Sequence, residues 1–125
     1  MAIDFEVIDK NCKNFRKPYK ILSLPEKFPK FFLDNEIYFP ISASKLLCSL
    51  DPYDDTLLSY GELEIIQQLC EKIHAIFMTV QDYSIYDILK ESEIKPKDLI
   101  GFSDSMQSLI AYALENDKAV WTVGD

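Results

Sequence analysis

The sequence predicts an α+β fold, a single domain over residues 1–125 in which a small antiparallel or mixed sheet packs against several helices. Strand-like alternation of apolar and polar residues stands at both ends of the chain, over residues 3–9 and 119–123. Helical periodicity fills the second half, with one long amphipathic helix near 60–80. The length of 125 residues and the apolar content of 48% suit one hydrophobic core. We therefore expect the N- and C-terminal strands to share one sheet.

The first half of the chain predicts short elements. Apolar and acidic side chains alternate over residues 3–9, which is typical of a half-buried strand. Prolines punctuate the next segment, where Tyr19 to Leu24 is expected to form a short strand and Glu26 to Leu33 one helical turn. Residues 37–41 are β-branched and aromatic, and their proline indicates an edge strand or the end of a strand. A short helix is expected from Ser42 to Leu50.

The long helix has the clearest signals in the sequence. Ser59 and Glu62 stand three positions apart before an apolar-periodic run, which is the spacing of a capping box. We expect a helix from about Tyr60 to Val80. Its apolar face is predicted to consist of Leu63, Ile66, Leu69, Cys70, Ile73, Ile76, Phe77 and Val80.

Two shorter helices and a strand are expected after it. Ser84 with Asp87 repeats the start signal for a helix through about Ser92, and Pro96 bars its continuation. Ser103 or Asp104 can cap a last helix that ends near Glu115. The apolar face of this last helix is expected to be Met106, Leu109, Ile110, Ala113 and Leu114. A turn at 116–117 then leads into the terminal strand.

The charge of the chain is uneven. Residues 1–45 carry eight Lys/Arg and six Asp/Glu, a net charge of +2, whereas residues 46–125 carry five Lys/Arg and fifteen Asp/Glu, a net charge of −10. Such a chain repels phosphate backbones and anionic membrane surfaces, so direct binding to nucleic acid or membrane is disfavoured. Basic proteins are the partners that this charge favours, although acidity also serves solubility alone.

The start of the chain and its cysteines favour a cytoplasmic location. The first ten residues contain acids and no long apolar run, so no signal peptide is expected. No stretch approaches the ~20 apolar residues of a membrane span. Free thiols suit a reducing cytosol.

The residue pattern predicts no catalytic centre, no cofactor and no metal site. Cys12, Cys48 and Cys70 are an odd number without a C-x-x-C pair, so neither a disulfide framework nor a zinc site follows. Cys70 falls on the apolar stripe of the long helix and is expected in the core. His74 falls at the border of that stripe, where we expect a structural role. Three glycines exclude a glycine-rich phosphate loop.

Residues 49–62, SLDPYDDTLLSYGE, concentrate carboxylates. The order D-P-Y-D-D-T does not fit the alternating ligands of an EF-hand loop, and Gly61 comes too late for one. A carboxylate pair for glycoside hydrolysis would not be visible in local spacing. Asp51 before Pro52 is expected to be a capped turn, with Asp51 a good helix N-cap and proline at the first helical position. No strong local role remains for Tyr53, Asp54, Asp55 and Tyr60.

The runs LDPYDDTLLSYGELEIIQQLCEKI and SMQSLIAYALENDKAVWTVGD resemble the small cytosolic immunity proteins encoded beside bacterial polymorphic or contact-dependent growth inhibition toxins. The resemblance implies a non-enzymatic toxin inhibitor whose partner is a cognate toxin domain, often a basic nuclease. It carries over no functional residue. Because aromatic anchors among acids suit protein recognition, we expect the contact surface to include Tyr53, Asp54, Asp55, Tyr60, Glu62 and Glu64.

An alternative is an acidic cytosolic chaperone for a secreted effector. Chaperones of this kind are small α+β proteins, usually dimeric, which offer hydrophobic grooves to an unfolded segment. A homodimer burying the region of Phe28, Phe31, Phe32 and Phe39 would favour this alternative, whereas a monomer that binds a folded partner would favour immunity. An enzyme is the third reading, and a deep pocket lined by ionisable residues would favour it. The sequence leaves the oligomeric state open.

Overall fold

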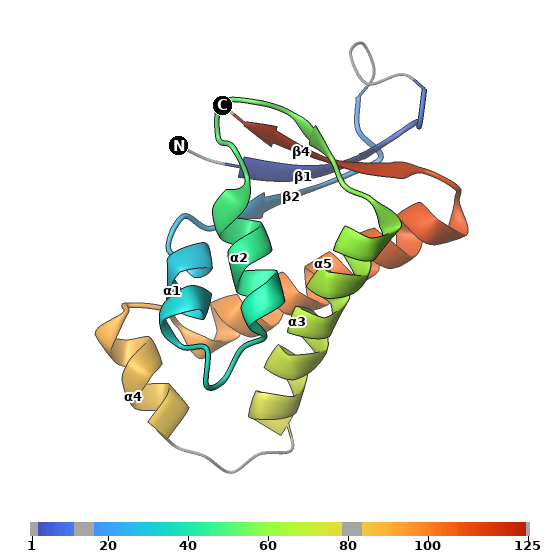
Figure 1. Ribbon diagram of the computed structural model, residues 1–125. Helices are drawn as coiled ribbons and strands as arrows, with labels where there is room; N and C mark the ends of the chain where they lie inside the picture. The colour runs from blue at the N-terminus through green and yellow to red at the C-terminus, as the bar shows by residue number, and fades with distance from the viewer. Residues whose placement is uncertain (1–2, 12–16, 79–83, 125) are drawn as a thin grey trace.

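The structure, a computed structural model, describes residues 3–11, 17–78 and 84–124. It is a single small α+β domain in which a four-stranded antiparallel sheet packs against the helices (Figure 1). The predicted fold class is thereby confirmed. In the described residues the elements are, in order, β1 (Ile3–Ile8), β2 (Lys20–Leu24), α1 (Phe28–Asp34), α2 (Ile41–Ser49), β3 (Thr56–Leu57), α3 (Tyr60–Met78), α4 (Ser84–Glu91), α5 (Pro96–Glu115) and β4 (Ala119–Gly124).

The terminal strands lie side by side at the centre of the sheet. Strand β1 pairs antiparallel with β2 and β4, and β3 pairs with β4, which gives the order β2-β1-β4-β3. Phe5 and Val7 are fully buried, whereas Asp4 and Glu6 beside them are partly exposed. The period-two pattern of β1 thus gives the sheet an inner face, which packs on the helices, and an outer face, which carries Asp4 and Glu6.

The core is one cluster of buried side chains between the inner face and the helices. Helices α3 and α5 pack against each other, and a buried hydrogen bond of 3.0 Å from Ser103 Oγ to the Cys70 carbonyl joins them. An aromatic group on α1 and the turn after it belongs to this cluster. Its members are at most 4% exposed, namely Phe28, Phe31, Phe32 and Phe39.

The start of α3 follows the prediction. The Glu62 amide donates to Ser59 Oγ at 3.2 Å and the Ser59 amide donates to Glu62 Oε1 at 3.0 Å, which is a capping box. The predicted apolar face is buried from Leu63 through Ile76, and Phe77 is partly buried. Val80 lies outside the described residues, and α3 is described as far as Met78.

Two predicted elements are wrong. Residues 37–41 form no strand, because the chain turns between α1 and α2, with Phe39 in the core and Ile37 83% exposed. Helix α5 begins at Pro96, not at Ser103 or Asp104. Proline fits the first helical position, where its missing amide hydrogen is not needed, so Pro96 starts α5 instead of only separating it from α4.

Residues 51–57 form a turn and a short strand. The Tyr53 amide donates to Asp51 Oδ1 at 2.8 Å, so the expectation that Asp51 caps a turn is confirmed. No helix follows it, because Thr56 and Leu57 pair with Thr122 and Trp121 of β4 as β3. Within residues 3–11, 17–78 and 84–124, no helix is long and apolar enough to cross a membrane.

Candidate protein-binding surface

An apolar row crosses the outer face of the sheet. Directly paired residues of neighbouring antiparallel strands point to the same side, and the register aligns Ile21, Glu6, Trp121 and Leu57 across all four strands. Ile21 is 58% exposed and Leu57 is 50% exposed, while Trp121 is partly buried. The outer face therefore presents large apolar side chains around one carboxylate.

Two further acidic side chains, Asp4 and Asp55, act on the carboxylate in this row. The partly buried Glu6 has a raised pKa, firstly because burial desolvates its carboxylate, and secondly because the charges of Asp4 and Asp55 repel it. Asp4 accepts a hydrogen bond of 2.7 Å from Ser23 Oγ on β2. In the described part of the chain, no lysine or arginine forms an ion pair with Asp4 or Glu6. We call Asp4, Glu6 and Asp55 with Ile21, Leu57 and Trp121 the acidic face.

The loop before β3 forms the rim of the acidic face. Asp54 is exposed, and its Oδ1 accepts a hydrogen bond of 2.8 Å from the Asp55 amide. Tyr53 is 76% exposed. The loop is held close to β4, since a Cβ placed on Gly124 would come within 2.0 Å of the Pro52 carbonyl oxygen. Glycine is thus needed at position 124 for this close approach.

The other predicted contact residues lie on the first two turns of α3. Glu62 is bound into the capping box, so its carboxylate already has a structural role. Glu64 is exposed on the same helix. Tyr60 exposes 64% of its surface, and its hydroxyl accepts a hydrogen bond of 3.1 Å from Lys10 Nζ. Of the six predicted residues, Asp55 is the one whose charge is shown to act on the acidic face.

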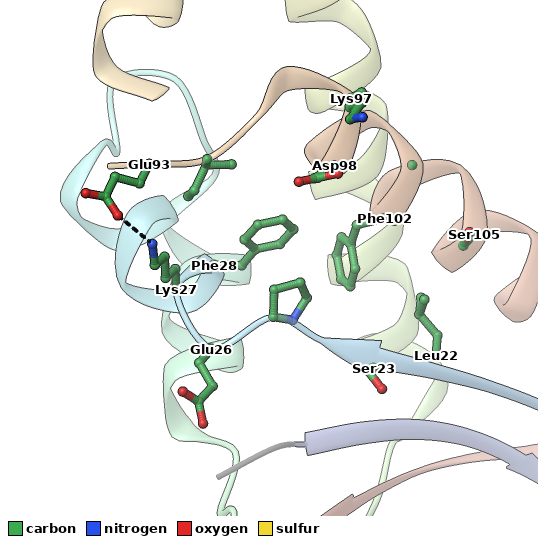
Figure 2. Close-up of a pocket in the computed structure, with 13 residues that line it drawn as sticks. Leu22, Ser23, Glu26, Lys27, Phe28, Glu93, Lys97, Asp98, Phe102 and Ser105 are labelled. Atoms are coloured by element: carbon green, nitrogen blue, oxygen red, sulfur yellow. Dashed lines mark hydrogen bonds and ion pairs between the residues drawn. The ribbon is translucent and has the colours of Figure 1, made fainter. Parts of the chain in front are cut away.

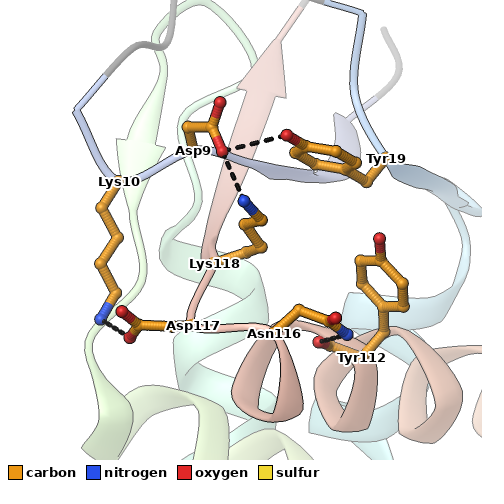
Figure 3. Close-up of polar contacts among 7 residues, drawn as sticks. All are labelled: Asp9, Lys10, Tyr19, Tyr112, Asn116, Asp117 and Lys118. Atoms are coloured by element: carbon orange, nitrogen blue, oxygen red, sulfur yellow. Dashed lines mark hydrogen bonds and ion pairs between the residues drawn. The ribbon is translucent and has the colours of Figure 1, made fainter.

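A polar network joins the chain segments at one end of the β1–β4 pair (Figure 3). Asp9 accepts hydrogen bonds from Lys118 Nζ at 2.7 Å and from the Tyr19 hydroxyl at 3.1 Å. Lys118 Nζ also lies 4.7 Å from the centroid of the Tyr19 ring. The pKa of Lys118 is raised, mainly because its ammonium donates to Asp9. This network links β1, the start of β2 and the turn before β4.

A second contact in Figure 3 joins the turn after α5 to the β1 end. Lys10 forms an ion pair with Asp117, and the hydrogen bond between them raises the pKa of Lys10 and lowers that of Asp117. Asp117 has a φ of 53°, in the left-handed region that Asp and Asn tolerate in turns. Lys10 and Lys118 are therefore paired with carboxylates within the fold, whereas among the described residues no ion pair holds Asp4 or Glu6.

His74, Cys70 and Cys48 are the described histidine and cysteines that catalysis or metal binding could use. His74 is exposed on α3 rather than at the border of the core. Cys70 is buried as expected, and burial raises the pKa of its thiol to about 11. Cys48 is exposed, and Cys12 lies outside the described residues. In residues 3–11, 17–78 and 84–124, no group of three or more His, Cys, Asp or Glu is placed to hold a metal ion.

Sequence reasoning missed most of the acidic face. The alternation of residues 3–9 indicates that Asp4 and Glu6 point away from the core. The exposed Ile21 and Leu57 join them only through the strand order and register. Comparison with known proteins adds no residue to this surface. No family model, no curated protein and no solved structure gives a significant match to the chain.

Proposed function

We propose that this protein is a non-enzymatic inhibitor that binds a basic protein through its acidic face, as a cytosolic immunity protein binds its cognate toxin domain. The observation that carries the proposal is the partly buried carboxylate of Glu6, which lies among exposed apolar side chains and is repelled by the charges of Asp4 and Asp55. Repulsion of this kind is unfavourable in the free protein. Lysine or arginine from a partner would relieve it and pair with the Glu6 carboxylate, which is already partly desolvated.

The apolar row supplies binding energy that charge complementarity alone does not supply. Charge complementarity mainly speeds association, whereas buried apolar and aromatic anchors contribute most of the binding energy. Ile21 and Leu57 are exposed on either side of Glu6 and Trp121, so one partner surface can cover apolar and acidic groups together. The net charge of −8 adds long-range attraction for a basic partner.

The effector-chaperone alternative has weaker support. The aromatic region that it would offer as a groove is part of the core in this fold, since Phe28, Phe31, Phe32 and Phe39 are nearly fully buried.

Site-specific photocrosslinking in the source cell tests the proposal. We would place p-benzoylphenylalanine at Leu57 on the acidic face, with a matched control at Ala111, which is exposed on α5. We expect Leu57 to capture one basic protein with a mass shift for a one-to-one complex, and Ala111 not to capture it. The captured protein should be toxic when expressed alone and harmless when this protein is co-expressed.

Two results would contradict the proposal. An acidic protein or a nucleic acid crosslinked at position 57 would show that the face does not select a basic partner. A basic protein captured equally from positions 57 and 111 would show that the acidic face is not the contact surface.

A further inference from the structure

Among the described strands, β2 has a free edge, and this edge adjoins a groove. The sheet order leaves β2 and β3 at the edges, and β3 has only two residues, whereas β2 has five. A five-residue edge strand spans roughly 17 Å. Exposed strand edges of this length bind other strands unless they are blocked.

The hydrogen-bonding groups on this edge belong to Ile21 and Ser23. The Tyr19 amide donates to the Val7 carbonyl at 2.8 Å, so the odd-numbered residues of β1 direct their backbone groups toward β2. In an antiparallel ladder, N–H and C=O groups point alternately to the two sides of a strand. Leu22 opposes Phe5 and faces β1, which leaves the backbone groups of Ile21 and Ser23 directed outward.

A dish-shaped pocket of about 750 Å³ lies along this edge, between β2, the start of α1 and the first half of α5 (Figure 2). Its apolar base is built from Pro25, Ile94 and the edge-to-face pair of Phe28 and Phe102, whose ring centroids are 5.4 Å apart. A second hollow of about 350 Å³ continues along β2, and Leu22 and Ser105 line both.

The wall opposite β2 is a stripe of small residues on α5. Gly101, Ser105 and Ser108 recur at helical spacing and line the two hollows. No atom lies within 4 Å of a Cβ built on Gly101, so packing within this chain does not require glycine there. Glycine in the middle of a helix is less favourable than alanine by about 0.5–1 kcal/mol. The open space beside Gly101 is instead what the close approach of another backbone needs.

We propose that an extended, positively charged peptide segment of a protein partner binds along β2 as a fifth strand. Its backbone pairs with Ile21 and Ser23, and one apolar side chain enters the pocket over Phe28 and Phe102. This is β-strand addition, in which main-chain hydrogen bonds give affinity and pockets read alternate side chains.

Charge favours a cationic segment over a second copy of this chain as the occupant of the groove. The hollows are lined by Lys20, Lys27 and Lys97 and by four carboxylates, those of Glu26, Glu93, Asp98 and Asp104. Lys27 is paired with Glu93, and Lys20 Nζ lies 5.3 Å from the centroid of the Tyr112 ring. Asp98 and Asp104 on α5 line the hollows and have no ion-pair partner in the described part of the chain. Two copies with a charge of −8 each would repel one another, whereas a lysine or arginine would pair with these carboxylates.

Selection from a display library of random dodecapeptides on the full-length protein tests this proposal. We expect enrichment of peptides with Lys or Arg and an apolar residue. When a selected synthetic peptide binds, amide hydrogen exchange at Ile21 and Ser23 should slow by about tenfold or more, because new hydrogen bonds protect these groups. This measurement uses the unmodified protein and does not depend on the folding of any variant.

Matched variants locate the site. Ser105→Phe fills the groove and should weaken peptide binding by about tenfold or more, while Ala111→Phe, an equal addition at an exposed α5 position, should leave it unchanged. Ile21→Pro removes an edge donor and should abolish binding, whereas Ile21→Ala keeps the donor and should retain it. Circular dichroism checks that each variant is folded.

Three outcomes would overturn the proposal. They are the absence of enriched cationic peptides, unchanged exchange at Ile21 and Ser23 in the complex, and a protein that is already a dimer with these amides protected. The last outcome would assign the edge to a second copy. The edge strand shares Ile21 with the acidic face, but the groove itself is lined by Leu22, Phe28 and Phe102 and its test needs no cognate partner, so either proposal can fail while the other stands.

Discussion

Gly124→Ala should dislodge the loop that forms the rim of the acidic face. The new Cβ would lie 2.0 Å from the Pro52 oxygen, 2.3 Å from the Pro52 carbonyl carbon and 3.0 Å from the Tyr53 nitrogen. A close carbon–oxygen contact is normally about 3.3 Å, so the loop or the end of β4 must move by roughly 1.3 Å. The obstacle is backbone, which cannot rotate away as a flexible side chain can.

Overpacking of this kind costs about 1–3 kcal/mol. For a chain of this length each kcal/mol lowers Tm by roughly 4 °C, so we expect a Tm lower by about 4–12 °C in differential scanning calorimetry. The amide NMR signals of Tyr53, Asp54 and Asp55 should shift more than those of α3 or α5, because the displacement begins at Pro52.

Gly101→Ala is the matched control. Its Cβ would meet nothing within 4 Å, and alanine favours the helix by up to about 1 kcal/mol, so this variant should be more stable than the wild type. A Gly124→Ala protein as stable as the wild type, or a Gly101→Ala protein less stable than it, would refute the packing described for these two positions.

Three further predictions concern capping, thiol burial and the acidic face. Ser59→Ala removes the acceptor for the Glu62 amide and should lower the free energy of unfolding by about 1 kcal/mol in urea titrations, whereas an unchanged midpoint would mean that the capping box does not stabilise α3. In a Cys12→Ser background at pH 8, a thiol reagent should label Cys48 rapidly and Cys70 only after denaturation. Cys70 is buried, and the pKa of about 11 of its thiol leaves ~0.1% as thiolate. Equal labelling rates of the two cysteines in the folded protein would contradict the burial of Cys70. The pKa of Glu6 is higher in the folded protein than in the unfolded chain, so folding favours the protonated carboxyl. The contribution of Glu6 to stability is therefore fully present below the unfolded pKa of about 4.3 and is lost as pH rises through the folded-state pKa. Glu6→Gln should therefore stabilise the protein at pH 7, by up to about 0.5 kcal/mol, and have no effect at pH 3; a loss of stability at pH 7 would show that the carboxylate is favourably placed.

Local signals in the sequence account for much of the fold. The period-two pattern of residues 3–9 and the capping box at Ser59 and Glu62 each act within a few residues, and both recur in the structure. The strand predicted over residues 37–41 is absent. The β-branched and aromatic composition of this segment reflects the burial of Phe39 in the aromatic core, not strand pairing. Propensity cannot separate these two causes of the same composition.

The candidate site was less predictable than the fold. Asp55 was singled out because it had no strong local role, yet it acts on Glu6, which is 49 positions away in the chain. β3 is two residues long and gives too little pattern to be recognised. Without β3, the place of Leu57 in the apolar row does not follow from the sequence. The edge position of β2 depends in turn on which strands are the neighbours of β1.

The acidic face is proposed to attract and hold a basic protein. The most direct test of this claim is the association rate with the captured partner, measured by stopped flow over a range of ionic strength. One variant combines Asp4→Asn, Glu6→Gln and Asp55→Asn; the control combines Glu71→Gln, Glu91→Gln and Glu115→Gln, exposed acids on α3, α4 and α5. Both remove the same charge. We predict that the first variant associates about tenfold or more slowly at low salt, with a weaker salt dependence, and that the control stays close to the wild type. Equal effects of the two variants would contradict the claim.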